Sequence, residues 1–407
     1  MIIIPKRKHN ISRNKISKNA IKILFRLHKS GYEAYLVGGG VRDLILGNKP
    51  KDFDLTTNAT PSEIQKLFKN CRLIGRRFQI AHIMFKKETI EVSTFRGHNN
   101  KKNSQKIFKK KKNLGILLRD NIFGKIEEDA ERRDLTINTL YFNIIDLSIR
   151  DYVGGIKDIK KKIIRLIGDP ETRYREDPVR ILRVIRFSAQ LKMKIEKYTA
   201  LAIPKLSKLI SHVPSARLYN ELNKLLQTGF GYKAYKKLNK FNLLETIFSF
   251  PFIHYNKKIK LLISSLIVKV LKKNDLRFKK KQKINIEFLW SAILWYPYFF
   301  QTIQIKKKKK INYKDASNIS LKIILKKASL LLSIPKQIIE SIKEIWKIIN
   351  FITYNSKKIS LTTKKNIKFF EAYNLYVIKK KIEKNKNIKQ IKLKKYNNFK
   401  KNNFITK

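Results

Sequence analysis

The sequence has one cysteine, few histidines and no long apolar run, and each shortage excludes a class of protein or site. Because Cys71 is the sole cysteine, the chain cannot form an internal disulfide, which favours a reducing compartment. The six histidines lack the spacing of a structural zinc site. The apolar run Leu261–Val268 is bracketed by lysines and is far shorter than the roughly 20 residues of a membrane span. The apolar start, Met1–Pro5, is too short for a signal peptide. We therefore expect a soluble, cytoplasmic protein with no membrane partner.

Acidic residues are also scarce, since 30 Asp and Glu stand against 93 Lys and Arg, for a formal net charge of +63. Such an excess predicts a polyanionic partner, most simply a nucleic acid. Lys, Ile and Asn are frequent throughout, as an AT-biased genome would produce. We interpret the sign of the charge as functional and much of its size as mutational bias. Charge alone would suit a nonspecific chromosome or membrane-surface binder, but that account leaves the glycine and carboxylate clusters of the N-terminal half unexplained.

The hydrophobic pattern changes type along the 407 residues, which are enough for two or more domains. Short β-type runs extend to about residue 150, and helical patterns follow. The predicted fold class is therefore α+β, with a mixed-sheet head followed by an all-α neck and body. The predicted parts are a basic, loosely held extension (1–20), a catalytic head (21–150), a helical neck (151–245) and a helical body with a basic tail (246–407). The polar segment 97–120 predicts a long loop inside the head.

Within the head, the pattern predicts strands separated by short helices. The expected strands are Ala34–Val37, Phe53–Leu55, Ala81–Phe85, Thr89–Phe95 and Leu140–Ile145, with helices at Ala20–Lys29, Val41–Leu46 and Pro61–Phe68.

A glycine turn follows the first of these strands. Gly38, Gly39 and Gly40 precede Arg42, which predicts a strand, a tight turn and the start of a helix. Bare backbone N–H groups at such a turn can hold phosphate. The turn matches neither a Walker A loop nor a dinucleotide fingerprint, so by itself it equally fits an ordinary strand-to-helix turn. Arg42 and the carboxylates that follow favour phosphate binding.

Two carboxylates, Asp52 and Asp54, come next, and residues two apart on a strand point to one face. Asp52 would suit a turn, but Asp54 lies inside an apolar segment, where its charge is costly without a cation. Glu91 would complete a three-carboxylate cage if its strand lies beside that of Asp54. Mg²⁺ prefers such oxygen ligands together with water and substrate phosphates. A phosphate seat beside a divalent-metal seat predicts nucleotidyl transfer.

Arginines recur with polar partners further along the chain. Arg132 and Arg133, followed by Asp134 and Asn138, suit a triphosphate and a ribose. The alternative is a surface helix with Glu–Arg pairs at i,i+4, which the following Thr-Ile dipeptide makes less favourable.

Asp177 before a proline is an ordinary helix start, with Asp at the N-cap and Pro at the first helical position. An amphipathic helix is expected over Val179–Leu191. In a functional interpretation, Asp177 can accept and Arg180 can donate hydrogen bonds, so the pair could engage the polar edge of a purine.

Together these segments resemble the class II nucleotidyltransferases, which are the bacterial poly(A) polymerases and CCA-adding enzymes. The matching segments are Gly38–Asp43, Asp52–Leu55, Glu91–Arg96, Arg132–Asn138, Asp151–Gly155 and Arg165–Gly168 through Arg173–Arg186. The resemblance covers roughly residues 30–230. Leu73–Ile83 and Ile122–Ala130 are similar to the poly(A) polymerase branch. Such polymerases often extend with an Arg-rich, Pro-containing segment, whereas the last residues here are lysine-rich.

The resemblance implies template-independent addition of AMP from ATP to RNA 3′ ends, a tailing that promotes RNA decay in bacteria. It implies Mg²⁺ at Asp52 and Asp54, with Glu91 or Asp134 as the third catalytic carboxylate. It also implies nucleotide binding by Gly38, Gly39, Arg42, Arg132, Arg133, Asn138, Asp177 and Arg180, with the last two reading adenine. The basic loop and helical half would hold single-stranded RNA through its phosphates. RNA-decay machinery is an expected partner.

Two alternatives remain open at this point. A CCA-adding enzyme would use CTP and stop after three additions to transfer RNA. An RNA-binding protein with a decayed catalytic site would extend no RNA. The aromatic residues of the helical half could stack RNA bases, but most of them are expected to fill helix-packing cores.

Overall fold

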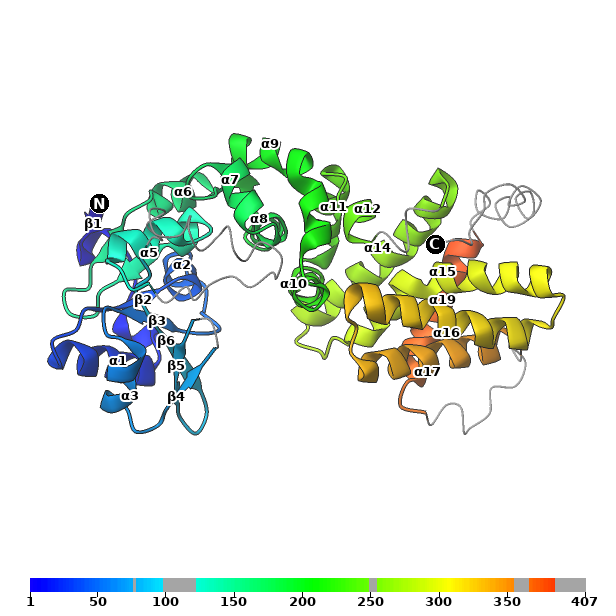
Figure 1. The fold of residues 1–407 in the computed structure, drawn as a ribbon, viewed down its shortest axis with the longest axis horizontal. Coiled ribbons are helices and arrows are strands. Elements are labelled where there is room, and N and C mark those ends of the chain that lie inside the picture. The colour runs from blue at the N-terminus through cyan, green and yellow to red at the C-terminus, as the bar shows by residue number, and fades with distance from the viewer. Residues whose placement is uncertain (76–77, 98–121, 249–254, 355–365, 385–407) are drawn as a thin grey trace, which may run out of the picture. The chain divides into compact units, whose positions relative to one another are not determined.

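The computed structural model describes the chain except for residues 76–77, 98–121, 249–254, 355–365 and 385–407 (Figure 1). The chain divides into two compact units. The first comprises Met1–Glu176 and Met193–Ala200, and the second comprises Asp177–Lys192 and Leu201–Lys407. The first contains a mixed sheet and the second is helical, so the predicted α+β fold class is confirmed. Apart from Gly97, the predicted loop 97–120 lies outside the described residues, as does most of the basic tail.

Eight strands form the main sheet, in the order β1-β8-β7-β2-β3-β6-β5-β4. They are β1 (Ile2–Ile4), β2 (Ala34–Val37), β3 (Asp54–Thr57), β4 (Cys71–Ile74), β5 (Ile80–Met84), β6 (Thr89–Thr94), β7 (Leu140–Phe142) and β8 (Ile149–Asp151). The β3–β6 pair is parallel and the other pairs are antiparallel, so the sheet is mixed as expected. Strand β4 is an edge strand that the sequence pattern did not predict.

Short helices surround this sheet in the first unit (Figure 1). They are α1 (Lys18–Lys29), α2 (Gly39–Ile45), α3 (Pro61–Leu67), α5 (Ile126–Arg132), α6 (Gly155–Lys161) and α7 (Pro170–Glu176), with 3₁₀ turns η1 (Lys6–Lys8), η2 (Arg13–Lys15) and η3 (Thr136–Asn138). α1 packs on β2 and β3, and α3 packs on β4 and β5. Thr60 caps α3 in a capping box with Glu63, ahead of a proline at the first position, which explains where that helix begins.

The expectation that residues 1–20 are loosely held is wrong. β1 pairs with β8 at the edge of the sheet, and Ile11 is fully buried. His9 Nε2 lies 2.8 Å from the carbonyl oxygen of Leu147, and Arg13 Nη2 donates to the carbonyl of Ile144 at 2.7 Å. The partners of His9 and Arg13 lie more than 130 residues away, so the local composition of the segment carries no sign of them.

The expectation that strands end near residue 151 is also wrong in one place. β9 (Ile163–Ile164) and β10 (Lys194–Ile195) form a two-stranded parallel sheet in the first unit. Each strand is two residues long, which is too short to leave a periodic pattern in the sequence.

The second unit consists of helices in the part that the structure describes. They are α8 (Val179–Gln190), the second half of α9 (Lys197–Leu206), η4 (Ser207–His212), α10 (Ser215–Leu226), α11 (Gly231–Lys240), α12 (Leu244–Ile247), α14 (Lys257–Lys279), α15 (Ile286–Lys309), α16 (Tyr313–Leu332), α17 (Lys336–Tyr354) and α19 (Phe369–Glu383). α8 confirms the predicted helix at Val179–Leu191. Its N-cap is Pro178 rather than Asp177, a shift of one residue that is common at helix ends.

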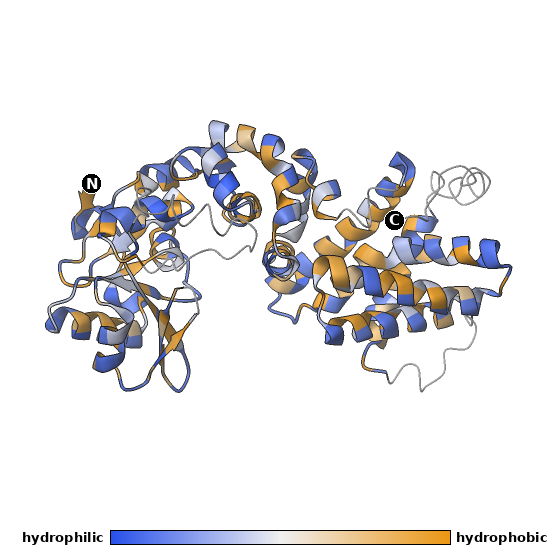
Figure 2. Cartoon of the chain, in the orientation of Figure 1, coloured by the Kyte–Doolittle hydropathy of each residue, from blue (hydrophilic) through white to orange (hydrophobic). Residues whose placement is uncertain are grey.

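Large aromatic residues fill the core of this unit, as expected for most of them. Trp290, Trp295 and Trp346 are almost completely buried, and the Tyr298 ring stacks on Trp346 with centroids 4.5 Å apart. Figure 2 shows hydrophobic and hydrophilic residues alternating along the helices of this unit. The apolar run Leu261–Val268 belongs to α14, where Leu262, Ile263, Leu266 and Ile267 are buried and Leu261 is exposed. No helix among the described residues is long and apolar enough to cross a membrane.

Candidate active site

One row of residues crosses the main sheet at the level of Asp54. In register, Tyr141 on β7 lies opposite Val37 on β2, which lies opposite Asp54 on β3. Asp54 pairs with Glu91 on the parallel strand β6, and Glu91 pairs with His82 on β5. Register partners project from the same face of a sheet, so Asp54 and Glu91 are neighbours on one face. This confirms that the Glu91 strand lies beside the Asp54 strand.

The surroundings of Asp54 disfavour the charged form of its carboxyl. Its side chain reaches solvent, but the surrounding protein removes part of its hydration. This desolvation raises the pKa of the Asp54 carboxyl, and the charge of Glu91 raises it further. Arg133 lowers the pKa, Asp52 raises it, and the net direction is upward. The site therefore concentrates negative charge that a bound cation would relieve.

Asp52 does not lie on the strand as expected. β3 begins at Asp54, and Asp52 precedes it with a side chain that is 73% exposed and 3.9 Å from Lys51 Nζ. Among the residues that the structure places, no group of three or more His, Cys, Asp or Glu side chains is arranged to hold a metal ion. The expected three-carboxylate cage is therefore not formed, because Asp52 sits in the loop rather than in the register row.

The glycine turn lies directly beside Asp54. Gly38, the N-cap of α2, has φ = 79° and ψ = −138°, a backbone conformation that side-chain-bearing residues rarely adopt. A Cβ atom at Gly38 would lie 3.8 Å from Asp54 Oδ2, and one at Gly39 would lie 3.5 Å from Arg42 Nη2. The predicted strand, turn and helix are all present, and they bring the bare backbone of the turn between a carboxylate and a guanidinium.

Arg42 is buried beneath this turn, with its side chain only 5% exposed. Its Nη1 donates to Asn138 Oδ1 at 2.6 Å, and its Nε and Nη2 donate to Asp43 Oδ1 at 2.9 and 2.8 Å. Arg42 and Asn138, which lie 96 residues apart in sequence, are thus joined directly. The bond ties α2 to η3 and fixes the orientation of both side chains.

Arg133 is held by a buried acidic partner. Its Nε donates to Asp129 Oδ2 at 3.0 Å and to the Tyr141 hydroxyl at 3.2 Å, and Tyr141 in turn donates to Asp129. Burial opposes the charged form, but the charge and hydrogen bonds of Asp129 and Tyr141 together outweigh it, so the net pKa of Arg133 is raised. An i,i+4 pair is present, but it joins Arg133 to the buried Asp129 and is not a Glu–Arg pair of a surface helix. It serves to hold a guanidinium whose charge reaches Asp54, while Arg132 donates to the carbonyl of Gly97.

Arg173 begins one of the matching segments, but the sequence did not predict its role in this site. Its Nη2 donates to the carbonyl oxygens of Arg132 and Arg133 at 2.7 and 2.6 Å, and its Nη1 donates to Glu176 at 2.8 Å. These carbonyls belong to the last turn of α5, where cationic side chains commonly satisfy the open acceptors. Asp134 follows at once, and its Oδ1 accepts from the N–H of Leu135. Arg173 therefore holds the segment that carries three of the predicted site residues.

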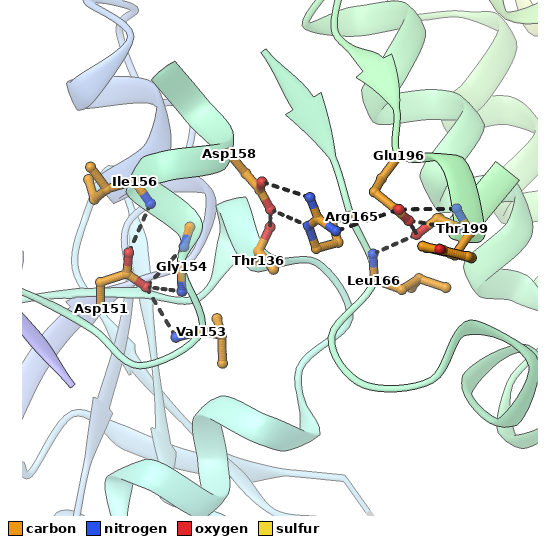
Figure 3. Close-up of polar contacts among 12 residues, drawn as sticks. Thr136, Asp151, Val153, Gly154, Ile156, Asp158, Arg165, Leu166, Glu196 and Thr199 are labelled. Atoms are coloured by element: carbon orange, nitrogen blue, oxygen red, sulfur yellow. Dashed lines mark hydrogen bonds and ion pairs between the residues drawn. The ribbon is translucent and has the colours of Figure 1, made fainter. Parts of the chain in front are cut away.

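A second missed feature is the polar network in Figure 3. The buried Asp158 carboxylate accepts from Thr136 Oγ1 at 2.7 Å and from Arg165 Nε at 3.0 Å. Arg165 Nη1 lies 3.6 Å from Glu196, which also accepts from Thr199. The backbone N–H of Thr136 donates to the Arg165 carbonyl. The network thus joins η3, the turn that ends at Asn138, to α6 and to the start of α9.

Asp151 organises the turn before α6 (Figure 3). Its buried carboxylate accepts four backbone N–H groups at 2.8–3.2 Å. The donors are Val153, Gly154, Gly155 and Ile156. Gly155 leaves no room for a side chain, because a Cβ there would lie 2.3 Å from the Thr136 carbonyl oxygen. The Asp151–Gly155 motif is therefore structural, and it supports the turn that carries Asn138.

Asp177 and Arg180 belong to the second unit. Both oxygens of Asp177 accept from Arg217 on α10, at 2.9 and 2.7 Å. The N–H of Val179 also donates to Asp177 Oδ1 at 3.2 Å, so the carboxylate still satisfies the start of α8. Arg217 was not singled out from the sequence, because only the packing of α10 against α8 brings it to Asp177.

Two family models match the chain. Residues 34–165 match the poly A polymerase head domain, and residues 192–256 match a region described as the probable RNA- and SrmB-binding site of polymerase A. The first match contains the register row, the glycine turn and the Arg132–Asn138 segment.

Curated relatives extend the match beyond these regions. The protein is 46% identical over 391 residues to poly(A) polymerase I of Salmonella typhi. The match covers 96% of this chain and 84% of that relative. It is 33% identical over 280 residues to the CCA-adding enzyme of Bacillus subtilis, covering 69% of this chain and 64% of that one. The poly(A) polymerase match is both higher and longer.

Solved structures agree on the fold. The CCA-adding enzyme of Bacillus stearothermophilus in complex with CTP superposes with a TM-score of 0.62 at 22% identity, over 89% of this chain and 80% of that chain. At that identity the likeness concerns the fold alone. From the curated relatives and the head model together, the chain belongs to the poly(A) polymerase family of nucleotidyltransferases.

Proposed function

We propose that the protein is a polynucleotide adenylyltransferase that adds AMP from ATP to the 3′ end of RNA without a template. In each step the RNA 3′-hydroxyl attacks the α-phosphate of ATP, a new phosphodiester forms, and pyrophosphate leaves. The observation that carries this proposal is the 46% identity over 96% of the chain to a protein named poly(A) polymerase I. The pairing of Asp54 with Glu91 beside the glycine turn supports it.

The carboxylates fit a divalent cation, which we propose to be Mg²⁺. The charges of Glu91 and Asp52 contribute to the raised pKa of Asp54. The carboxylates therefore repel one another, and a bound cation would reduce that repulsion. Mg²⁺ commonly takes one or two carboxylates and completes its shell with water and substrate phosphates, so a three-carboxylate cage is not required. Asp52 and Asp54 would hold it, and when bound it supplies charge stabilisation to the reacting phosphates. The register with Asp54 favours Glu91 over Asp134 as the third catalytic carboxylate.

The protein groups around the carboxylates would bind ATP. Gly38 and Gly39 leave the backbone of the turn bare for the triphosphate, and Arg42 lies beneath it. Arg133 is preorganised by its buried partner and adds positive charge near Asp54, and Arg132 precedes it on α5. Asn138, already oriented by Arg42, would contact the ribose. A guanidinium fixed before ATP binds loses little freedom on binding, which favours affinity.

Asp177 and Arg180 would select adenine by hydrogen bonds to its polar edge. The Asp177 carboxylate has about four lone-pair sites, so it can keep Arg217 and still accept from a base. We expect Arg180→Ala to relax the choice among nucleotides more than it slows AMP addition. The test compares extension rates with ATP, CTP, GTP and UTP. A variant that is equally slow with all four but still chooses ATP would contradict this role.

The basic surface of the chain would hold RNA mainly through its phosphates. We also propose RNA-decay machinery as a partner. We further propose a cytoplasmic location, as expected from the single cysteine.

Product length distinguishes the proposed activity from its alternatives. Purified protein, Mg²⁺ and a labelled single-stranded RNA are incubated with each nucleotide separately, and the products are resolved on a gel. A long ladder with ATP alone is the expected result. Addition of CTP to a trimmed transfer RNA, ending after the final A, would instead indicate a CCA-adding enzyme. RNA binding without extension by any nucleotide would indicate a decayed catalytic site.

A further inference from the structure

The face of the sheet that carries Asp54 and Glu91 continues onto β5 and β4. Glu91 pairs with His82 on β5, and His82 pairs with Arg72 on the edge strand β4. His82 Nε2 lies 3.8 Å from Glu91 Oε1, and Arg72 is exposed. Along the register row, two carboxylates are thus followed by an imidazole and a guanidinium. The chemistry of the surface changes from cation binding to anion binding within two strands.

On the other side of Asp54 the same face is already occupied. α5 covers Val37 and Tyr141, which lie in one buried cluster with residues of that helix. The glycine turn approaches Asp54 at Gly38, and Arg133 is anchored on the Tyr141 hydroxyl. These are the groups to which the proposed function assigns the triphosphate. ATP therefore takes the side of the carboxylates on which the glycine turn and Arg133 lie.

Geometry of the reaction then places the second substrate. In an in-line displacement, the attacking oxygen and the leaving pyrophosphate lie on opposite sides of the α-phosphate. With the triphosphate at the glycine turn and Arg133, the RNA end is assigned to the side of β6, β5 and β4. No pocket has to be invoked there, because the sheet surface itself is accessible.

That surface offers a cation and apolar side chains to a single strand. Arg72 provides a cation for a backbone phosphate. Ile74 and Met84 lie two residues from Arg72 and His82, so they share their face. They are 51% and 37% exposed, so their apolar surface is open to a ligand. Apolar side chains next to a cation can contact the face of an unstacked base while the cation contacts a phosphate, without reading the sequence.

We propose that the 3′-terminal segment of the RNA lies across β5 and β4, with Arg72 contacting a backbone phosphate and Ile74 contacting a base. The inference rests on the proposed function, since it takes RNA as the acceptor of AMP. It assigns a substrate to an exposed sheet edge that the sequence pattern did not predict as a strand.

The test compares Arg72→Gln with Lys22→Gln, an equal loss of charge at an exposed residue of α1. For Arg72→Gln we expect the KM for RNA to rise about fivefold, as for the loss of one exposed ion contact, with the KM for ATP within about twofold of wild type. In a plot of the logarithm of the RNA-binding constant against the logarithm of the salt concentration, measured with a labelled single-stranded RNA oligonucleotide, the slope should become shallower by about 0.7. Lys22→Gln should change none of these quantities.

A second variant, Ile74→Asp, puts a negative charge on the proposed RNA path at a residue that is already half exposed. We expect it to raise the KM for RNA at least as much, with an unchanged thermal unfolding midpoint. Unchanged RNA KM and salt slope in both variants, in a protein that still tails RNA with ATP, would overturn the inference and leave the proposed function standing. A rise in the KM for ATP instead would assign the surface to the nucleotide and overturn it too. A wild-type protein that extends no RNA would refute both.

Discussion

Arg173 offers a direct test of how the site is held, because it contacts main-chain oxygens rather than the reacting groups. Its Nη2 serves the carbonyls of Arg132 and Arg133, and its side chain is 13% exposed. Hydrogen bonds from a charged donor contribute roughly 1.5–3 kcal/mol. One nitrogen serves both acceptors, and the Glu176 partner is half exposed and adds little. We therefore expect Arg173→Met to lower the free energy of unfolding of the first unit by about 2 kcal/mol.

The loss of stability should be visible as a lower melting temperature. For a unit of this size, about 2 kcal/mol corresponds to a fall of about 4–8 °C. Arg173→Lys keeps the charge but loses the planar fork, so an intermediate fall is expected. Arg175→Met, an exposed residue of the same helix, is the matched control and should leave the midpoint unchanged.

The same variants separate a positioning role from a merely structural one. Well below the melting temperature, Arg173→Met should reduce kcat/KM for ATP by about tenfold. Without Arg173 the carbonyls of Arg132 and Arg133 lose their donor, so the side chains of Arg133 and Asp134 are expected to shift. RNA binding measured without ATP should not change, and Arg173→Lys should recover part of the activity. A variant that melts earlier but keeps kcat/KM for ATP within twofold of wild type would refute the reasoning.

Three further predictions concern other parts of the same unit. Burial and neighbouring carboxylates raise the pKa of Asp54, so the stability linked to it is present at low pH and declines as pH rises through the raised value. Asp54→Asn should therefore melt higher than wild type at pH 8 but not at pH 3.5, in thermal scans at both values. Gly38→Ala imposes a side chain on φ = 79°, so it should cost about 1–3 kcal/mol of stability and reduce AMP addition, as measured by denaturant unfolding and extension assays. Asp151→Asn leaves one oxygen for four N–H donors and should cost about 2 kcal/mol in denaturant unfolding, with equal stability of the two proteins counting against the capping role.

Local patterns predicted the parts of the head whose structure is set locally. β2 begins and ends at the predicted residues, because its apolar run stops at a glycine turn that only glycine can make. The Asp54–Glu91 pairing was predicted conditionally, since both carboxylates interrupt apolar strands at positions that fit one open face. Asp52 was misplaced onto the strand because alternation alone does not say where a strand begins.

Features that depend on distant partners could not be predicted. Arg217 reaches Asp177 from 40 residues away, and Arg173 reaches Arg132 from 41. Neither arginine differs in its local pattern from many other basic residues of so cationic a chain. Pairing of the first strand with β8 likewise depends on a partner late in the head. In each case the decisive contact is tertiary, and a periodic pattern in one sequence carries no record of it.

The account's central claim is that this chain adds AMP to RNA at the carboxylates of the register row. The most direct test compares wild type and Asp54→Asn in one extension assay with Mg²⁺, ATP and a labelled single-stranded RNA, alongside RNA binding by both proteins. We predict a long ladder for wild type, and no extension for Asp54→Asn in a protein that binds RNA normally. Extension by Asp54→Asn at the wild-type rate would contradict the claim.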